Sequence, residues 1–180
     1  MPRLFVALAL PPDVRLRLAG LCNGVPGAHW VGLEQFHLTL RFVGEVDGTT
    51  ADDVADTLDD VTGQPFELKL KGVDLFDKGR NPTALWVGIA EKAPLVRLHE
   101  KIDRRLGRVG LEPEARKFHP HVSLARLKGA WGERVAAFLA AHAEFALPPI
   151  PIAAFHLYSS HCGRDGAHYR IEQSYPLAGA

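Results

Sequence analysis

The feature that most constrains the fold is a histidine-bearing segment that occurs twice with the same pattern of apolar and polar residues. Residues 36–42 read FHLTLRF, and residues 118–126 read FHPHVSLAR. Apolar and polar side chains alternate in both, which is typical of a β-strand with one buried face. Strict alternation places Leu38, Leu40 and Phe42 on the buried face of the first strand. We therefore expect both segments to be strands that border the core.

On the opposite face, each strand presents a histidine and a hydroxyl group two residues apart. These are His37 and Thr39 in the first strand, and His121 and Ser123 in the second. A single histidine on a strand is more often structural than catalytic. The same pairing on two strands favours a shared functional site instead. Alternation also predicts that Arg41 lies on the same face as His37.

The rest of the chain alternates between strand-like and helix-like periodicity, which indicates an α+β fold. Residues 73–82 are largely polar, and we expect a hairpin or an exposed loop there. The predicted strands cover about 3–10, 66–71, 84–89, 152–159 and 168–174, with another beginning at 145–147, and the predicted helices cover about 12–22, 49–61, 93–109 and the segment from Trp131 to His142.

The two halves of the chain, about 1–82 and 83–180, follow one plan of strand, helix, loop, histidine strand, helix and strand. An internal duplication with a pseudo-two-fold axis is the simplest explanation. We expect residues 1–180 to form a single domain with two lobes, each containing an antiparallel sheet and helices. The axis would make His37 and His121 face one another across a central cleft.

Composition and charge argue against several classes of protein. The chain has 180 residues, 47% of them hydrophobic, which suffices for one core, and its formal net charge is zero. Coating of nucleic acid through overall charge is therefore not expected, although a local basic cleft remains open. The two cysteines, Cys22 and Cys162, lack the spacing of a disulfide framework or zinc site. The apolar start is too short to span a membrane, so we expect a soluble protein. The low cysteine content suits a reducing compartment, and we expect a monomer in the cytoplasm.

Two opposed imidazoles, each with a neighbouring hydroxyl, suit acid–base catalysis on a phosphate diester. A neutral histidine takes a proton from the nucleophile, and a protonated one gives a proton to the leaving oxygen. The Thr39 and Ser123 hydroxyls would donate hydrogen bonds to the non-bridging phosphate oxygens. A strained cyclic phosphate needs little further activation, and carboxylates do not cluster as they do around magnesium pairs. We therefore expect neither a metal nor a cofactor.

The segments FHLTLRFVGE at 36–45 and FHPHVSLAR at 118–126 resemble the two signature motifs of the two-histidine (2H) phosphoesterases. The branch most similar to this chain is the RNA 2′,3′-cyclic phosphodiesterases, also called 2′–5′ RNA ligases. The likeness extends to RLFVAL at 3–8, LWVG at 85–88 and the closing segment from Tyr158 to Leu177. This resemblance implies a bilobal fold with a central active site. It also implies hydrolysis of RNA 2′,3′-cyclic phosphate ends to 2′-phosphomonoesters, with 2′–5′ ligation as a reverse reaction.

By position in the motifs, the resemblance implies that His37 is the proton donor to the departing 3′ oxygen. His121 would be the proton acceptor that activates water, and Thr39 and Ser123 would hold the phosphate. Ser123 stands where the family more often has threonine, and serine lacks the β-branch that restricts χ1. Inspection of the sequence leaves the acid and base roles nearly interchangeable because the motifs are pseudo-symmetric.

Three further residues, Arg126, Arg41 and Phe42, are candidates for substrate binding. Arg126 ends the second motif and could clamp a phosphate. Alternation places Arg126 on the core side, however. The alternative to phosphate binding is a salt bridge at the rim of the cleft. Arg41 is a comparable candidate. Phe42, like Trp30, could stack on a base at the cleft or belong to the core.

Four other histidines raise the question of a metal site. His119 lies two residues before the second motif histidine, which creates a His-x-His pattern. The intervening Pro120 and the lack of a third nearby ligand argue against metal binding. We expect surface or structural roles for His156, His161 and His168.

Two alternatives remain open at this stage. The substrate could be a small cyclic nucleotide, an ADP-ribose cyclic phosphate or a 2′–5′ linkage, because related enzymes share the motifs. The chain could also be an RNA-binding or ligand-sensing module without turnover. Two intact histidine–hydroxyl pairs count against the second alternative, since a pure binder needs no opposed proton-transfer groups.

Overall fold

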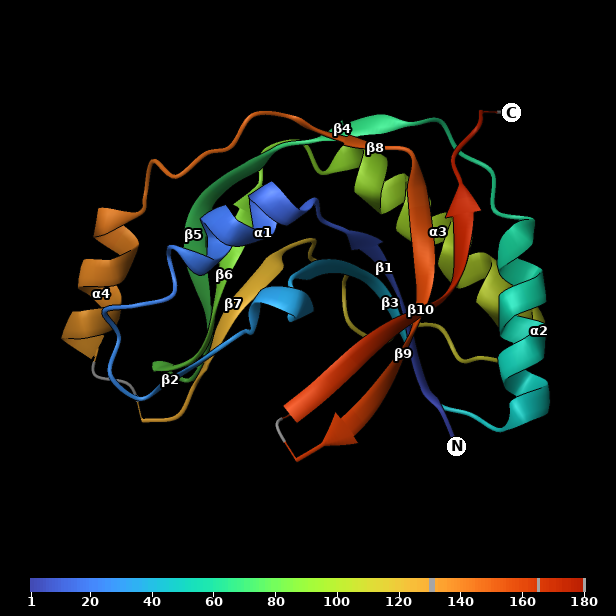
Figure 1. The fold of residues 1–180 in the computed structure, drawn as a ribbon, viewed down its shortest axis with the longest axis horizontal. Coiled ribbons are helices and arrows are strands. Elements are labelled where there is room, and N and C mark those ends of the chain that lie inside the picture. The colour runs from blue at the N-terminus through green and yellow to red at the C-terminus, as the bar shows by residue number, and fades with distance from the viewer. Residues whose placement is uncertain (130–131, 165, 180) are drawn as a thin grey trace.

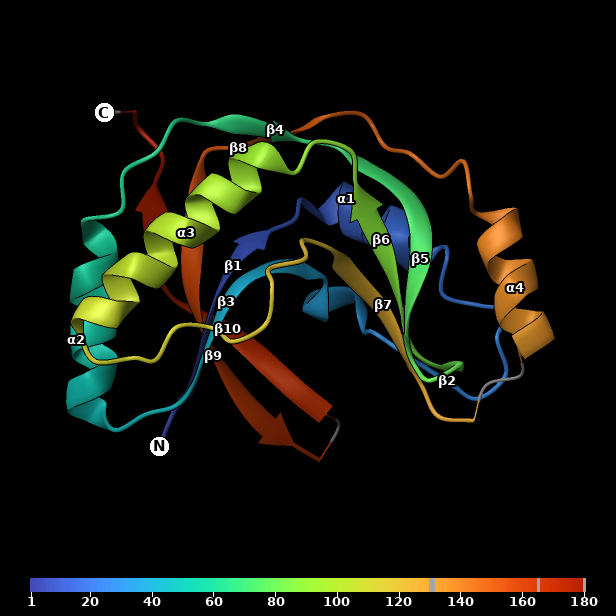
Figure 2. The same ribbon diagram turned by 180° about the vertical axis from the view of Figure 1, so that it is seen from behind.

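The computed structural model describes residues 1–129, 132–164 and 166–179. Two four-stranded antiparallel sheets stand side by side, with a short two-stranded ladder across the top of both (Figure 1). The view from behind shows α3 lying diagonally across the outer side of one sheet (Figure 2). This arrangement confirms the predicted α+β fold with two lobes.

Sheet A has the strand order β10-β9-β1-β3, and sheet B has the order β2-β7-β6-β5. The strands are β1 (Arg3–Ala9), β2 (Ala28–Trp30), β3 (His37–Glu45), β4 (Phe66–Leu68), β5 (Leu70–Lys78), β6 (Asn81–Ile89), β7 (Val122–Leu127), β8 (Ile150–Ile152), β9 (Ala154–Gly163) and β10 (Gly166–Pro176). The helices are α1 (Pro12–Ala19), the 3-10 helix η1 (Leu33–Gln35), α2 (Gly48–Asp59), α3 (Ala93–Arg108) and α4 (Gly132–Ala141).

Most predicted elements are confirmed, and the differences have local causes. The segment 73–82 forms a hairpin between β5 and β6, with Gly79 and Arg80 in the turn at φ of 59° and 74°. The residues at 145–147 contribute only a bridge between Lys71 and Ala146, because two prolines follow and cannot donate to a ladder. Trp131, expected at the start of α4, lies outside the described residues.

Each sheet takes strands from both halves of the chain. In sheet A, β9 and β10 complete the sheet begun by β1 and β3, and in sheet B, β2 and β5 join β6 and β7. The division near residue 82 falls inside β6. The two lobes therefore do not coincide with residues 1–82 and 83–180, and the exchange of strands ties them into one unit. Internal duplication stays a prediction.

The core lies behind the two histidine strands. The side chains of Leu38, Leu40, Val122 and Leu124 are at most 1% exposed. Burying a leucine of this kind stabilises the fold by about 2 kcal/mol. The four residues confirm the predicted buried faces up to the middle of each strand, so the histidines and hydroxyls turn to the other side.

Strict alternation fails at the same place in both histidine strands. In β3, Thr39 pairs with Ala7 and Arg41 with Val6, so that Leu40 is an extra residue. This is a β-bulge, and it shifts the next side chains, Arg41 and Phe42, to the opposite face. Arg41 therefore turns into the core and Phe42 turns out, which reverses the prediction for both.

The bulge in β7 lies at the equivalent position. Ser123 pairs with Trp86 and Ala125 with Leu85, which leaves Leu124 as the extra residue. Ala125 is 1% exposed, whereas Arg126 is exposed. The prediction that Arg126 lies on the core side is wrong for the same reason as in β3.

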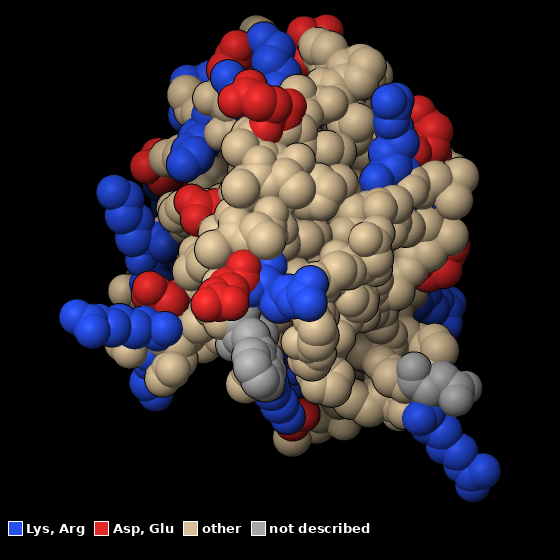
Figure 3. Space-filling view, turned by 90° about the vertical axis from the view of Figure 1, so that its left-hand side faces the viewer, with Lys and Arg blue, Asp and Glu red and all other residues tan. Residues whose placement is uncertain are grey.

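The outer surface on the side of α4 carries charges of both signs, interspersed among uncharged residues (Figure 3). This agrees with the equal totals of 21 basic and 21 acidic residues. None of the described helices is both long and apolar enough to cross a membrane.

Candidate active site

A cavity of about 490 Å³ opens between the two sheets and contains residues of both sequence motifs. A cavity of this size can hold a nucleotide-sized ligand. Sheet A contributes His37, Thr39 and Phe42, and sheet B contributes Ser123 and Arg126. The structure therefore brings together, from segments far apart in the sequence, five of the seven residues predicted to form the site, whereas His121 and Arg41 are not among the residues that line the cavity.

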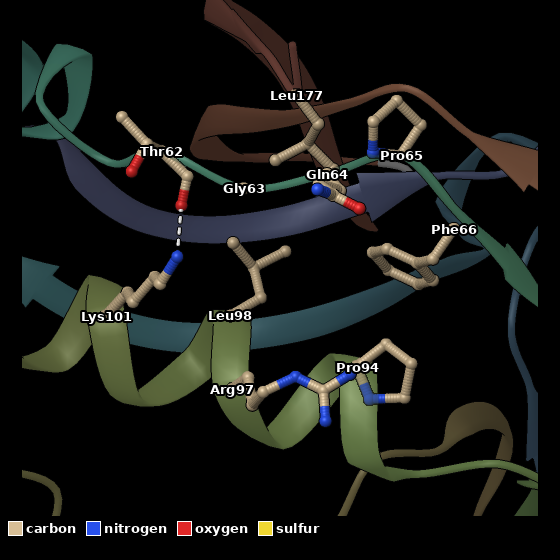
Figure 4. A pocket seen from close by; sticks show the side chains of 10 residues that line it. All are labelled: Thr62, Gly63, Gln64, Pro65, Phe66, Pro94, Arg97, Leu98, Lys101 and Leu177. Atoms are coloured by element: carbon tan, nitrogen blue, oxygen red, sulfur yellow. Dashed lines mark hydrogen bonds between the residues drawn. The ribbon is translucent and has the colours of Figure 1, made fainter. Parts of the chain in front are cut away.

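A second pocket, of about 300 Å³, lies between α3 and the segment that precedes β4 (Figure 4). Lys101 Nζ donates to the carbonyl of Thr62 at 2.7 Å there, and Arg97 lies beside an apolar floor. Its ten lining residues, all of them described, include no His, Asp, Glu or Cys. The cleft between the sheets is thus the better candidate, because it holds groups that exchange protons near neutral pH.

The ring of His37 is held by hydrogen bonds on both of its nitrogens. Nδ1 lies 2.6 Å from the carbonyl oxygen of Gln35, and Nε2 lies 3.0 Å from Thr39 Oγ1. Because a carbonyl can only accept, Nδ1 carries the proton in the neutral ring. Nε2 is then the basic nitrogen, and it accepts from the Thr39 hydroxyl.

Aromatic side chains surround His37 on the sheet A side. Its ring centroid lies 5.0 Å from that of Phe5, 5.2 Å from Tyr169 in an edge-on arrangement and 6.2 Å from Tyr158. Burial lowers the pKa of His37, the hydrogen bond to Gln35 opposes this effect, and the nearby His121 lowers the pKa further. The free site therefore favours a neutral His37.

His121 has a matching arrangement, one residue before β7 begins. Its Nδ1 lies 2.6 Å from the carbonyl oxygen of His119, which again leaves Nε2 as the basic nitrogen. Its ring centroid lies 5.0 Å from that of Phe76, edge-on, and 5.8 Å from Trp86. Burial lowers the pKa of His121, while the bond to the His119 carbonyl opposes that shift.

His121 acts electrostatically on His37. His121 lowers the pKa of His37, as a like charge close by does. A second proton is therefore harder to add to the pair than the first. Such coupling opposes protonation of both rings at once.

Each bulge exposes a main-chain carbonyl that needs a partner, and the two sheets provide different ones. The carbonyl of Leu40 accepts a hydrogen bond of 2.7 Å from Nδ1 of His99, whose ring stacks on Phe118 at 4.2 Å. The carbonyl of Leu124 accepts one of 2.8 Å from the backbone N–H of Val31. The β3 bulge is thus fixed by a side chain of α3, and the β7 bulge by a backbone bond that continues the register between β2 and β7.

Arg41 does not share the face of His37, so that prediction is wrong. The side chain is 7% exposed, and its Nε lies 2.6 Å from Asp103 of α3. The remaining guanidinium nitrogens donate to the carbonyls of Phe42 and Glu112. Arg41 therefore anchors β3 to α3 and is absent from the cavity lining, because the bulge turned it inward.

Phe42 and Arg126 reach the cavity from opposite sheets. The side chain of Phe42 is 55% exposed, and its ring centroid lies 6.2 Å from that of Phe5. Arg126 is exposed and lines the same cavity. Trp30 borders the cavity too, but its ring packs on Phe138 in the core. The bulges thus place an aromatic ring and a guanidinium at the same cavity, and their roles toward substrate stay predictions.

Three further histidines contact neighbouring side chains. His119 packs against Trp86 at 4.9 Å, His156 Nδ1 lies 2.8 Å from a serine hydroxyl, Ser174 Oγ, and His161 Nε2 lies 3.0 Å from another, that of Ser159. Within the described part of the chain, no group of three or more His, Cys, Asp or Glu is placed to hold a metal ion.

The aromatic residues that surround the two histidines are not among the site residues predicted from the sequence. Phe5 lies in a strand that is buried on both faces, so its sequence is a continuous apolar run without alternation. Tyr158 and Tyr169 come from the far end of the chain. Phe5, Tyr158 and Tyr169 become neighbours of His37 only through the strand order of sheet A. The sequence could have identified them only if that order had been known.

The model of the 2′-5′ RNA ligase superfamily matches residues 11–163, which is most of the chain. The chain belongs to this superfamily. An RNA 2′,3′-cyclic phosphodiesterase of Aeropyrum pernix is 39% identical over 117 residues, covering 64% of this chain and 66% of that protein. A protein of the same name from Thermotoga maritima is 29% identical over 180 residues, covering 94% and 92%.

Solved structures of the same fold support the architecture. TT0787 of Thermus thermophilus aligns with a TM-score of 0.81 at 23% identity over 98% of both chains. LigT of E. coli, solved with 3′-AMP, aligns with a TM-score of 0.79 at 22% identity over 99% of both chains. The superfamily assignment confirms the resemblance noted from the two histidine motifs, and these alignments confirm the bilobal fold.

Proposed function

We propose that the chain hydrolyses RNA 2′,3′-cyclic phosphodiester ends to 2′-phosphomonoesters by two-histidine acid–base catalysis. The observation that carries the proposal is the matched geometry of His37 and His121. Each ring is oriented by a carbonyl two residues earlier at 2.6 Å, which leaves Nε2 as the basic nitrogen. The names of the Aeropyrum and Thermotoga relatives support the same reaction.

In the proposed step, water attacks the cyclic phosphorus and His121 Nε2 takes its proton. The bond between phosphorus and the 3′ oxygen breaks, and protonated His37 gives its Nε2 proton to that oxygen. The product is a 2′-phosphate with a free 3′ hydroxyl. Solvent exchange returns both histidines to their starting states.

The hydrogen bond between His37 and Thr39 supports the donor role of His37. When Nε2 is protonated it donates to Thr39 Oγ1, and the hydroxyl proton becomes free to bind a non-bridging phosphate oxygen. Ser123 would bind the phosphate from sheet B in the same way. The negative phosphate raises the pKa values of both histidines on binding, which opposes the effect of burial.

Arg126 and Phe42 complete the proposed site. The Arg126 guanidinium would bind the phosphate in a charge-assisted manner, and Phe42 would stack on the terminal base. Both side chains line the cavity that holds His37, Thr39 and Ser123. Attack by an RNA 5′ hydroxyl in place of water, with the same bond to the 3′ oxygen broken, would give 2′–5′ ligation with the same residues.

The test is turnover of an RNA ending in a 2′,3′-cyclic phosphate, in the presence of EDTA, with identification of the phosphate isomer. The intact protein should yield only the 2′-phosphate, and His37→Ala and His121→Ala should each lose activity about 10²–10⁴-fold. A 3′-phosphate product, a need for added metal or retention of activity by either variant would contradict the proposal. Binding without turnover would favour a non-catalytic module.

We also propose that the protein works as a monomer in the cytoplasm. Its two cysteines, Cys22 and Cys162, are both free thiols in the structure, which suits a reducing compartment. Light scattering of the purified protein should give the mass of a single chain, 19.7 kDa. A stable dimer at micromolar concentration would contradict the monomer.

A further inference from the structure

We propose that Arg3 and His29 form a second anion subsite in the cleft, which binds the internucleotide phosphate preceding the cyclic phosphate of an RNA. The inference rests on the proposed function. This internucleotide phosphate distinguishes an RNA end from a free cyclic nucleotide, which carries no second phosphate.

The first observation is the charge of the cavity lining. The chain as a whole has 21 basic and 21 acidic residues. The lining includes Arg3, Arg126, His29 and His37, and its eighteen residues, all of them described, include no Asp or Glu. A positively charged cavity on a neutral chain is complementary to an anionic ligand. Of these four basic side chains, the proposed chemistry uses only His37 and Arg126.

The second observation is the position of Arg3 relative to the catalytic histidine. The ladder between β1 and β9 is regular, with Phe5 opposite Tyr158 and Arg3 opposite Ser160. Arg3 and Phe5 therefore point to the same face, and Phe5 contacts the ring of His37. Two residues along a strand span about 7 Å, which is comparable to one sugar–phosphate unit. Arg3 thus lies one such step along the cleft from Phe5.

The third observation is that His29 reaches the same cavity from the opposite sheet. In the ladder between β2 and β7, His29 lies directly opposite Arg126. Residues paired in this way present their side chains side by side on one face, with Cβ atoms about 5 Å apart. His29 is exposed, and β2 is the edge strand of sheet B. The subsite therefore has a basic group on each wall.

The Arg3 side chain is available to a ligand. It is exposed, and its ladder neighbour on β3 is Glu45. These two described residues form no ion pair, and Glu45 does not line the cavity. A guanidinium without a carboxylate partner, in a lining without carboxylates, is suited to bind a phosphodiester through two parallel hydrogen bonds.

The experiment compares two substrates: a 2′,3′-cyclic mononucleotide and a trinucleotide ending in the same cyclic nucleotide. The intact protein should have the lower KM for the trinucleotide. Arg3→Gln and His29→Gln should raise the trinucleotide KM, by about tenfold for Arg3→Gln, and leave the kinetics on the mononucleotide unchanged. Unchanged mononucleotide kinetics also show that the variants fold.

Salt dependence and two further variants sharpen the test. A lost phosphate contact should reduce the slope of log KM against log salt concentration for the trinucleotide by about 0.7. Arg3→Lys keeps the charge and should restore most of the affinity. Arg17→Gln removes an exposed arginine from α1, outside the cavity, and should change nothing.

The outcomes separate the subsite from the proposed function. If the intact protein hydrolyses neither substrate, both proposals fail. If it hydrolyses both with equal kcat/KM, the chemistry stands and the subsite is overturned. The subsite is also overturned if Arg3→Gln affects both substrates equally, or if Arg17→Gln has the same effect as Arg3→Gln.

Discussion

The two histidine strands have the same pattern and the same bulge, yet they present different groups beyond it. In β3 the residue that follows the bulge and faces the cleft is Phe42, and in β7 it is Arg126. The shared bulge brings the third candidate position of each motif into the cavity. The difference in residue gives one wall an aromatic surface and the other a cation, so a pseudo-symmetric frame carries an asymmetric site.

The two bulges also differ in how they are held. The carbonyl of Leu40 depends on the side chain of His99, and Arg41 is fixed by Asp103. The carbonyl of Leu124 depends on the main chain of Val31. The β3 half is therefore open to disruption by single substitutions in α3, whereas the β7 half is supported by backbone that no side-chain replacement removes.

The largest expected effect is the loss of activity when either of the two histidines is replaced. His37→Ala and His121→Ala should each reduce kcat/KM about 10²–10⁴-fold. The double variant should lose little beyond either single one, because the two groups act as a unit. Steady-state kinetics on a cyclic-phosphate RNA measure this, with His168→Gln, outside the cavity, as the control. Multiplicative losses would mean that the histidines work independently.

The next effect tests the asymmetry beyond the bulges. Arg126→Ala should reduce kcat/KM by about tenfold or more on every cyclic phosphate, because it removes a charge-assisted contact to the phosphate. Phe42→Ala should raise KM by a similar factor only when the substrate has a base to stack. Kinetics on a cyclic nucleotide and on ribose cyclic phosphate lacking a base separate the two. Identical substrate profiles for the two variants would contradict the assigned difference.

The hydrogen bond from His99 to the Leu40 carbonyl at the β3 bulge predicts a smaller effect, which is on the free energy of unfolding. His99→Ala leaves the buried Leu40 carbonyl without its donor and removes the stack on Phe118. We expect the free energy of unfolding to fall by about 2–3 kcal/mol. Urea denaturation measures this loss, and His99→Gln, which keeps a donor, should recover part of it. If both variants unfold like the intact protein, His99 does not hold the bulge.

The smallest effect is a pH dependence of stability that both histidines share. Burial lowers their pKa values in the folded state, whereas an unfolded histidine has a pKa of about 6.5. As pH falls below about 6.5 the unfolded chain binds protons first, so stability should decline by up to about 1.4 kcal/mol per pH unit for each group. Above that pH the histidines should contribute no slope.

Urea titrations at several pH values measure this slope for the intact protein and for His37→Gln and His121→Gln. Each variant should show a shallower decline below pH 6.5, because it lacks one group with a lowered pKa. Unchanged slopes in both variants would show that other groups cause the acid sensitivity.

Sequence alone could predict the strands, the two histidines and the paired hydroxyls, because side-chain period two holds as far as Leu40 and Leu124. It could not predict the faces of Arg41, Phe42 and Arg126. A bulge depends on the register with neighbouring strands and on partners for the freed carbonyl. Those partners come from α3 and from the segment after β2, which are distant in the sequence.

The aromatic surroundings of the two histidines show the same limit. Tyr158 and Tyr169 reach His37 only because β9 and β10 join sheet A beside β1. The same order of strands and helices in the two halves predicted that each lobe consists of consecutive residues, whereas each sheet combines strands from both halves. Strand exchange between lobes is set by long-range pairing, which local periodicity does not encode.

The most direct test of the two-histidine account is the pH dependence of kcat/KM on a cyclic-phosphate RNA, measured in a chelator. Catalysis by one neutral and one protonated imidazole should give a bell-shaped profile. Because burial lowers both pKa values in the free site, the acidic limb should lie below about pH 6.5. A flat profile from about pH 5 to about pH 9, with the chemical step resolved in single turnovers, would contradict acid–base catalysis by His37 and His121.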